Sequence, residues 1–330
     1  MAESCHPVII IRSYDLTDSP KKHIPIIHSR RELWDRAKRF RAFYIMMIPG
    51  IAFFILFRYG AMWGQIMAFQ NYSPLLGIFR SEWVGFSLFQ RVIKSPQFFQ
   101  LFRNTFIIAV YNIVFYFPIP IILALMLNEV KHQRFKRIVQ SLVYVPHFIS
   151  WMVVVGITYI MFNIQNGVVV QLWTDVFGTK LDILTNPNAL RPTLVIQHIW
   201  KEAGWGTIIF LAALSGVDSE LYEAAYIDGA SGFQRLWHIT LPSIRGTIMI
   251  MLILRMGRFL DTGFDQIFNM LNAMNRSLGE VFDTYIYTMG ITGGQFSYTT
   301  AVGFFKSIIG LIMVYLCDKL AKIVGEEGVY

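Results

Sequence analysis

Long apolar stretches separated by short polar links dominate this sequence. A helix needs roughly 20 mostly apolar residues to cross the hydrocarbon core of a bilayer. Six stretches meet this requirement, with approximate ranges 43–69, 104–127, 138–162, 192–214, 245–269 and 300–318. The pattern predicts an all-α membrane protein with six transmembrane helices. Residues 43–330 form its transmembrane domain, and residues 1–42 form an N-terminal polar tail.

The composition supports a membrane protein. Hydrophobic residues make up 55% of the chain and charged residues 15%, and the mean hydropathy is +0.47. An ordinary soluble domain carries roughly 25% charged residues, so this chain has too few to cover a water-facing surface. Intrinsic disorder is excluded because it requires low hydrophobicity. A disulfide scaffold is excluded because Cys5 and Cys317 are the only cysteines.

The distribution of Lys and Arg predicts the orientation in the membrane. The tail, the links 128–137 and 215–245, and the C-terminal end hold 17 of these residues, against 6 in the alternate links. Positive residues collect on the cytoplasmic side, so both termini are expected to be cytoplasmic. The same distribution accounts for the net charge of +8 and excludes nucleic acid as a partner.

Charged residues also occur inside the predicted spans. They comprise five cations and three acids: Arg58, Lys201, Arg255, Arg258, Lys306, Glu202, Asp261 and Asp265. Each costs at least about 2.5–3.5 kcal/mol at the centre of a bilayer. These side chains are therefore expected to face protein or water.

The link 215–242 is longer than a turn requires and predicts two short helices. Asp218 is placed to cap the first helix, and Gly229 is placed to end it. Ser231 and Gln234 have the spacing of a capping box for the second helix. Pro242 is expected to stop that helix before the fifth span.

The same link carries a family motif. Glu223-Ala224-Ala225, Gly229 and Ile239-x-Leu241-Pro242 resemble the EAA motif, E-A-A-x3-G-x9-I-x-L-P. This motif marks permease subunits of binding-protein-dependent ABC importers. The resemblance covers roughly residues 40–325 and is closest to the carbohydrate branch, including maltose-type and alginate-type permeases. Its segments include 81–89, 124–137, 146–151, 220–230 and 293–307.

The resemblance implies a type I ABC importer permease fold in the bacterial cytoplasmic (inner) membrane. It implies a second, homologous permease subunit, two ABC ATPase subunits, an extracytoplasmic solute-binding protein and an oligosaccharide substrate. The EAA loop would dock on the ATPase, with Glu223 making a charged contact and the small Ala224, Ala225 and Gly229 allowing close approach. Asp228, Ile239, Leu241 and Pro242 complete the expected coupling residues.

The chain is expected to be a transport subunit with no enzymatic activity. It has no G-x4-G-K-[ST] phosphate loop, so ATP and Mg are expected on the partner ATPase and no cofactor on this chain. Its seven histidines show no metal-ligand spacing, and no G-x-S-x-G elbow occurs.

Two polar helix faces are candidates for the substrate pathway. On the fifth helix, steps of 3 and 4 residues place Arg255, Arg258, Thr262, Asp265 and Asn269 on one face. On the fourth helix, one face would carry Gln197, Lys201 and Trp205. Tryptophans stack on sugar rings, and cations pair with carboxylates. The excess of cations over acids, with the resemblance to uronate-oligomer importers, predicts an acidic, alginate-like oligosaccharide or polysaccharide.

Three alternatives remain open at this point. The buried charges could pair internally, Arg258 with Asp261 or Asp265 and Lys201 with an acid of another span, and serve helix packing only. An ion-coupled secondary sugar transporter could use the same charges as a relay, although it would have no use for a docking motif at 215–242. A membrane-embedded transferase lacks a paired-acid or metal constellation.

Overall fold

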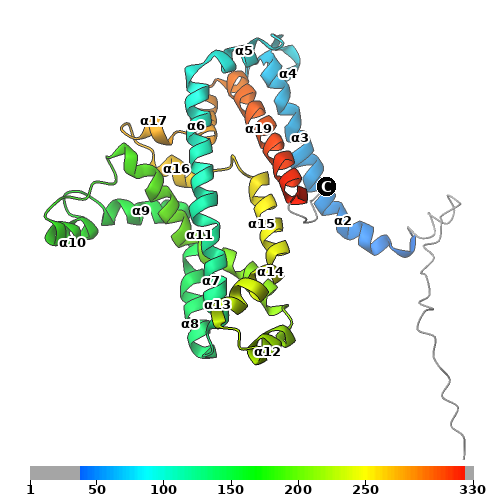
Figure 1. The fold of residues 1–330 in the computed structure, drawn as a ribbon. Coiled ribbons are helices and arrows are strands. Elements are labelled where there is room, and N and C mark those ends of the chain that lie inside the picture. Colours follow the sequence, from blue (N-terminus) through cyan, green and yellow to red (C-terminus); the bar gives the residue numbers. More distant parts are fainter. Residues whose placement is uncertain (1–37, 324–330) are drawn as a thin grey trace, which may run out of the picture. The chain divides into compact units, whose positions relative to one another are not determined.

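The computed structural model describes residues 38–323 (Figure 1). Most of the predicted polar tail, and Cys5 within it, lie outside the described residues. The chain divides into two compact units at residue 62, and each is described by itself.

The first unit is helical throughout its described part. It contains α2 (Arg41–Phe53), the π-helix η1 (Phe54–Tyr59) and α3 (Gly60–Met62). Pro49 lies inside α2. None of its side chains is buried in these three elements. Together with the residues up to Phe69, they form a run of 29 residues that is long and apolar enough to cross a membrane.

The second unit opens with the end of the first predicted span, followed by further short elements. They are η2 (Trp63–Phe69), β1 (Gln70–Asn71), α4 (Gly77–Arg80), β2 (Glu82–Trp83) and α5 (Ser87–Lys94). The two strands pair antiparallel, with Gln70 opposite Trp83. This two-residue ladder is a small departure from the predicted all-α structure.

The second predicted span is one long helical run. α6 (Pro96–Tyr111) continues through the π-helix η3 (Asn112–Tyr116) into α7 (Pro118–Glu129). Pro118 has no N–H to donate, so the ordinary hydrogen-bond ladder is interrupted immediately before it. The helix widens into a π-turn there, and the run remains 34 residues long.

The third predicted span is bent, because its helices meet at 99°. α8 (Gln133–Tyr144) and the 3-10 turn η4 (Val145–Phe148) precede the bend, and α9 (Trp151–Met161) follows it. Pro146 lies in the turn, and the Ser150 side chain accepts a hydrogen bond from the Val153 N–H to cap α9. The apolar stretch 138–162 is therefore covered by two helices rather than one. The connection to the next span contains α10 (Val168–Phe177) and η5 (Pro187–Ala189).

The fourth predicted span is the unbroken helix α11 (Leu190–Ser215). Its 26 residues extend about 39 Å at 1.5 Å per residue. Gly204 allows α11 to approach the backbone of α8, because a Cβ atom at this position would lie only 2.1 Å from the Val143 carbonyl oxygen.

After α11 come α12 (Ser219–Ile227), α13 (Gly232–Arg235), the π-helix η6 (Leu236–Thr240) and α14 (Leu241–Ser243). The chain then turns by 57° into α15 (Arg245–Gly257). α15 ends far short of the predicted helix over 245–269. Non-helical backbone follows, with Gly263 at φ +91°, before α16 (Phe264–Met270) begins. The fifth predicted span is therefore broken.

The last elements are α17 (Arg276–Gly279), α18 (Phe282–Tyr285), the π-helix η7 (Ile286–Thr292) and α19 (Phe296–Ile323). Within the described residues, three helices are long and apolar enough to cross a membrane, and bent pairs raise this to five. α11 is not among them, so the count of six spans stays a prediction. Figure 1 places α5 at one end of the second unit and α12 and α13 at the opposite end.

Candidate functional site

The link that carries the EAA motif forms the two predicted helices. The Asp218 carboxylate accepts a hydrogen bond of 2.9 Å from the Glu220 N–H and caps α12. At the other end, Gly229 has φ +75°. A residue with a Cβ atom would be strained in this backbone conformation, whereas glycine is not. The Ala230 N–H then reaches the Ala225 carbonyl at 2.9 Å. Both helix-end predictions are confirmed.

The second helix of the link begins at the predicted capping box. The Ser231 N–H donates to Gln234 Oε1 at 2.7 Å, and the Gln234 N–H donates back to Ser231 Oγ at 3.3 Å. The helical run ends at Ser243, one residue beyond Pro242. Pro242 has no N–H to donate, and it follows the π-helix η6, where the α-helical pattern of backbone hydrogen bonds is already interrupted.

A hydrogen bond holds the two halves of the link together. Tyr222 Oη lies 3.0 Å from Thr240 Oγ1, and Thr240 is buried. The sequence did not predict this contact. Tyr222 is not a motif residue, and no local sequence pattern indicates a partner 18 residues away. This contact fixes the angle between α12 and the segment that leads into the fifth span.

Four of the eight predicted coupling residues line a hollow of about 280 Å³ at the surface of the link. Ala225, Asp228, Gly229 and Ile239 line it, with Gln234, Arg235 and His238. Glu223 is exposed beside it, and no ion pair engages its carboxylate among residues 38–323. Leu241 is half-buried and Pro242 exposed.

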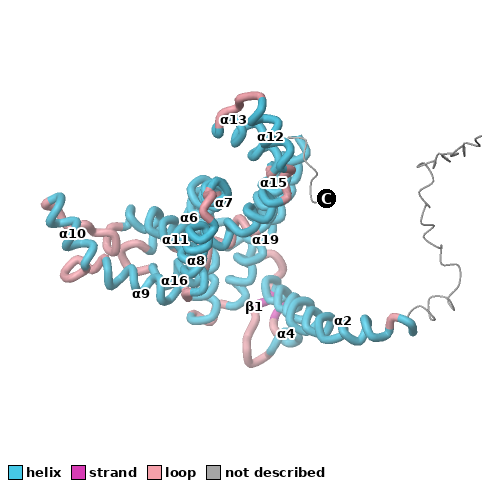
Figure 2. Tube along the Cα trace, turned by 90° about the horizontal axis from the view of Figure 1, so that it is seen from below, coloured by secondary structure: helices cyan, strands magenta, loops and turns pink. Residues whose placement is uncertain are grey.

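Large apolar side chains of the same link are also exposed. Tyr226, Ile227, Phe233 and Trp237 are 60–84% exposed, and the rings of Phe233 and Trp237 stack with centroids 6.3 Å apart. Figure 2 shows α12 and α13 projecting away from α6, α7 and α11. Large exposed apolar side chains in one projecting segment are typical of a protein interaction site. We call this surface, residues 218–242, the coupling surface.

The second candidate region centres on Lys201 of α11, which is only 5% exposed. Its Nζ atom donates to the His147 carbonyl oxygen at 2.6 Å and lies 3.0 Å from Glu202 Oε1. Glu202 Oε2 lies 2.7 Å from His147 Nδ1. The carbonyl belongs to the last turn before the 99° bend, where helical donors are missing. Lys201 therefore pairs internally, but with its own neighbour rather than with an acid of another span.

Aromatic rings surround this ion pair. His147 stacks on Trp205, with centroids 4.4 Å apart and planes 4° apart, and Trp151 lies parallel to His198 at 5.9 Å. Tyr116 contacts His198 edge-on at 4.4 Å. We call Tyr116, His147, Trp151, His198, Lys201, Glu202 and Trp205 the aromatic cluster. The sequence predicted Lys201 and Trp205 as site residues but not the other rings. Tyr116, His147 and Trp151 lie on other segments of the chain, and His198 lies on α11 one position away from the predicted polar face.

Arg255 joins the aromatic cluster from α15. Its guanidinium carbon lies 5.8 Å from the centroid of the Tyr116 ring, within cation–π range. The structure thus brings together Lys201, Trp205 and Arg255 from the two predicted faces. Gln197, in contrast, is buried and engaged in the protein interior: its amide donates to Thr158 Oγ1 at 2.7 Å and accepts from Gln266 Nε2 at 2.9 Å.

The predicted polar face of the fifth span does not exist as one face. Arg255 is on α15, Arg258 and Thr262 are in the break, and Asp265 and Asn269 are on α16. The break at 258–263 rotates the last two residues away from the helical register of the first. Asn269 donates to the carbonyl of Asp265 at 2.7 Å, and the buried Thr262 hydroxyl has no hydrogen-bond partner among the described residues.

Lys306 of α19 holds this break in place. Its Nζ atom lies 2.7 Å from Asp261 Oδ1 and 2.6 Å from Asp283 Oδ1. Arg258 lies 3.7 Å from Asp261, so the predicted pairing of these two residues is confirmed. This contact is longer than the 2.7 Å contact between Asp261 and Lys306. The Arg258 side chain is 79% exposed and lines a cavity of about 380 Å³ together with Lys306.

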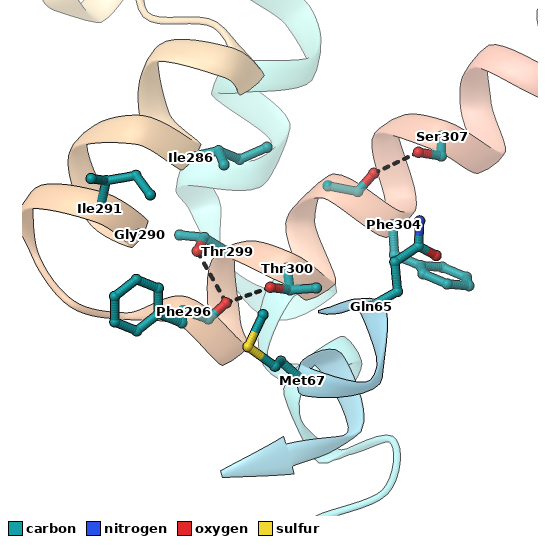
Figure 3. Close-up of a pocket in the computed structure, with 11 residues that line it drawn as sticks. Gln65, Met67, Ile286, Gly290, Ile291, Phe296, Thr299, Thr300, Phe304 and Ser307 are labelled. Carbon is teal, nitrogen blue, oxygen red and sulfur yellow. Dashed lines mark hydrogen bonds between the residues drawn. The ribbon is translucent and has the colours of Figure 1, made fainter. Parts of the chain in front are cut away.

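A separate cavity of about 380 Å³ lies between η2, η7 and α19 (Figure 3). Its wall includes Gln65, Phe296, Thr300, Phe304 and Ser307. The Thr300 and Ser307 hydroxyls donate to carbonyl oxygens of their own helix, as the close-up shows for both. The lining is therefore mainly apolar, unlike the aromatic cluster. The described residues also contain no group of three or more side chains that could hold a metal ion.

Comparison with known proteins identifies the family. Residues 116–324 match the family "Binding-protein-dependent transport system inner membrane component". The chain is 48% identical to the protein LplB of Bacillus subtilis strain 168, over 94% of this chain and 98% of LplB. It is 49% identical to the polygalacturonan/rhamnogalacturonan transport system permease protein YteP of the same strain, over 87% and 89% of the two chains.

A solved structure is also similar. A chain of a bacterial alginate ABC transporter, crystallised in complex with an alginate pentasaccharide-bound periplasmic protein, superposes with a TM-score of 0.83 at 34% identity. The match covers 90% of this chain and all of that chain. The matched family is one of transport components, which opposes the ion-coupled and transferase alternatives. The chain therefore belongs to the family of binding-protein-dependent transport system inner membrane components, as a permease subunit of the kind found in sugar ABC importers.

Proposed function

We propose that this chain is one of two permease subunits in an ATP-driven importer of acidic oligosaccharides or polysaccharides. In this proposal it crosses the cytoplasmic (inner) membrane six times, with α8, α9 and α15, α16 forming bent spans and both termini cytoplasmic. Two ABC ATPase subunits hydrolyse ATP with Mg, and an extracytoplasmic solute-binding protein delivers the substrate. The permease itself holds no cofactor and performs no covalent chemistry.

The coupling surface is the observation that carries the coupling part of the proposal. It combines a rigid frame, fixed by two capped helices and the Tyr222–Thr240 contact, with an exposed acid at Glu223 and a hollow between small residues. A partner side chain can enter that hollow because the small residues Ala225, Gly229 and Ala230 in its lining leave room for it. Its direct continuation into α15 would transmit a displacement of the ATPase to the fifth span.

The acidic substrate is inferred from the relatives and from the charges. The YteP name specifies polygalacturonan and rhamnogalacturonan, and the structural neighbour transports alginate. In this chain, Lys201 and Lys306 lie within 3.0 Å of acids, whereas Arg255 faces the Tyr116 ring. Arg258 makes a longer contact of 3.7 Å with Asp261 and is 79% exposed beside an open cavity. These two arginines are the proposed contacts for substrate carboxylates, with Trp205 as a stacking surface for a sugar ring.

Alternating access would use the two breaks as hinges. A bent helix pair has few backbone hydrogen bonds across its break, so the segments can reorient once the Lys201–His147 and Lys306–Asp261 contacts separate. In the proposed cycle, closure of the ATPase dimer moves the coupling surfaces together. The segments beyond the breaks then open the pathway to the outer side.

The proposal is tested with the complete complex reconstituted in lipid with its binding protein. ATP hydrolysis should be stimulated more by oligogalacturonates or oligoalginates than by neutral oligosaccharides of the same length. An Arg255→Gln variant should lose part of the stimulation by the acidic sugars. Equal stimulation by neutral sugars would refute the acidic substrate, and a complex without associated ATPase would refute the importer assignment.

A further inference from the structure

α5 packs one face into the protein and presents the other to solvent. Leu88, Phe89 and Val92 are at most 8% exposed and belong to a buried cluster that includes Phe282 and Val302. Ser87, Gln90, Arg91 and Lys94 are exposed on the opposite side of the same eight-residue helix. The floor under these polar side chains is therefore rigid.

These polar side chains surround a cavity of about 600 Å³. Its lining is completed by Ser95, which follows α5, and by Tyr298 of α19, more than 200 residues further along the chain. Sites for small molecules commonly have volumes of about 300–1,000 Å³. The cavity is separate from the aromatic cluster and shares no residue with it.

The charge of this cavity is uncompensated. Arg91 and Lys94 have no ion-pair partner among residues 38–323. The carboxylates of the α17–α18 segment, which packs against α6, are already engaged: Glu280 pairs with Arg276, and Asp283 pairs with Lys306. Two cations one helical turn apart therefore face an open cavity with hydroxyl, amide and phenol groups but no acid in its lining.

We propose that this cavity is an outer binding site for the carboxylate group of an acidic oligosaccharide, which Arg91 and Lys94 hold before the sugar enters the pathway. The inference rests on the proposed function. α5 lies at the end of the second unit opposite α12 and α13 (Figure 1), so it faces the outside if the coupling surface faces the cytoplasm. The substrate arrives from that side.

The residue types fit this ligand. A guanidinium and an ammonium form charge-assisted hydrogen bonds to carboxylate oxygens. Ser87, Gln90 and Ser95 offer donors and acceptors for sugar hydroxyls, and the Tyr298 ring offers an apolar face for a pyranose. A phospholipid phosphate is the other source of anionic oxygens near a membrane surface, and the experiment separates the two.

The test uses the whole complex in phosphatidylcholine nanodiscs, without the binding protein. Trigalacturonate is the probe, maltotriose is its neutral counterpart, and binding is measured by calorimetry. The Arg91→Gln/Lys94→Gln variant should weaken trigalacturonate binding by about tenfold or more, because two charge-assisted contacts are lost. Arg80→Gln removes an exposed cation of α4 outside the cavity and should leave the affinity unchanged. An Arg91→Lys/Lys94→Arg variant should retain most of it.

Unchanged trigalacturonate binding in the double Gln variant would overturn the inference. The inference would also be overturned if the double Gln variant bound trigalacturonate normally and lost only co-purified phosphatidylglycerol, which would indicate a lipid site. Loss of affinity for the binding protein alone would likewise overturn it. The proposed function is judged separately, by ATP hydrolysis with the binding protein present. If oligogalacturonates stimulate hydrolysis but the double variant binds them normally, the importer assignment stands and the outer site does not.

Discussion

The Lys201 ammonium donates to the His147 carbonyl oxygen at 2.6 Å, at the last helical turn before the chain bends by 99°. A buried cation thus replaces the backbone donors that the bend removes. Glu202 neutralises the cation and also contacts His147 Nδ1, so two adjacent residues of α11 fix the bend from one side. Ion pairing inside a membrane protein here has a definite role in backbone geometry.

Replacement of Lys201 by Met should destabilise the bend. The substitution preserves side-chain length but leaves the His147 carbonyl without its donor and Glu202 without its cation. An unsatisfied buried polar group costs about 1–3 kcal/mol, and the uncompensated carboxylate adds to this. We expect a lower midpoint of thermal unfolding in detergent. A Lys201→Met/Glu202→Gln double variant should recover part of the loss, and an unchanged midpoint in the single variant would contradict the capping role.

Gly204 should tolerate no side chain. A Cβ atom there would lie 2.1 Å from the Val143 carbonyl oxygen, so α8 and α11 would have to separate. Overpacking of this kind costs roughly 1–3 kcal/mol or more. Gly204→Ala should therefore reduce thermal stability, while Gly156→Ala should not, because no atom lies within 4 Å of the Cβ position in that α9 residue. Equal stability of the two variants would show that the helices are further apart.

Glu223→Lys should impair assembly with the ATPase. Glu223 is exposed on the coupling surface and has no ion pair within the part of the chain that the structure describes, so charge reversal leaves the fold intact. Co-purification of the ATPase should fall several-fold with normal membrane insertion. Glu129→Lys reverses an exposed charge at the end of α7, outside the coupling surface, and serves as the control. Normal sugar-stimulated ATP hydrolysis in Glu223→Lys would argue against the docking role.

Reporter fusions test the six-span topology. Fusions after Leu127 and Arg235 should report the cytoplasm, and fusions after Asn186 and Asn272 should report the outer side. The Asn186 fusion is decisive for α9 to α11, because a cytoplasmic signal there would mean that the bent third span enters and leaves on the same side.

The loop before η5 should loosen in acid. Burial opposes ionisation of Asp182, but hydrogen bonds from the Thr185 hydroxyl and N–H outweigh it, so the pKa of Asp182 lies below its ordinary value of 3.8. A depressed carboxyl pKa gives stability that is present above the ordinary value and lost as pH falls through the lowered one. At neutral pH the Thr185 amide should exchange slowly, and Asp182→Ala should accelerate its exchange. Unaltered exchange would exclude the capping contact.

The local structure of the coupling surface could be predicted from sequence because its signals are local. An N-cap, a capping box and a glycine that ends a helix each act within four residues, so Asp218, Ser231, Gln234 and Gly229 behave as their spacing indicates. Three apolar runs likewise gave spans of adequate length: Arg41–Phe69, which begins with α2, Pro96–Glu129, which joins α6 and α7, and Phe296–Lys319 of α19. The Tyr222–Thr240 contact lay beyond this range.

Hydropathy alone determined that the chain is a helical membrane protein, and the motif spacing determined its family. The tertiary structure decided where the spans break and which buried charges meet. A continuous apolar run carries no information about a bend that a distant side chain stabilises, as Lys201 does at His147 and Lys306 does at Asp261. The predicted polar face of the fifth span failed because helical periodicity places residues on one face only while the backbone stays helical. At residues 258–263 the backbone leaves the helix, and the Asp261 side chain instead pairs with Lys306 of α19.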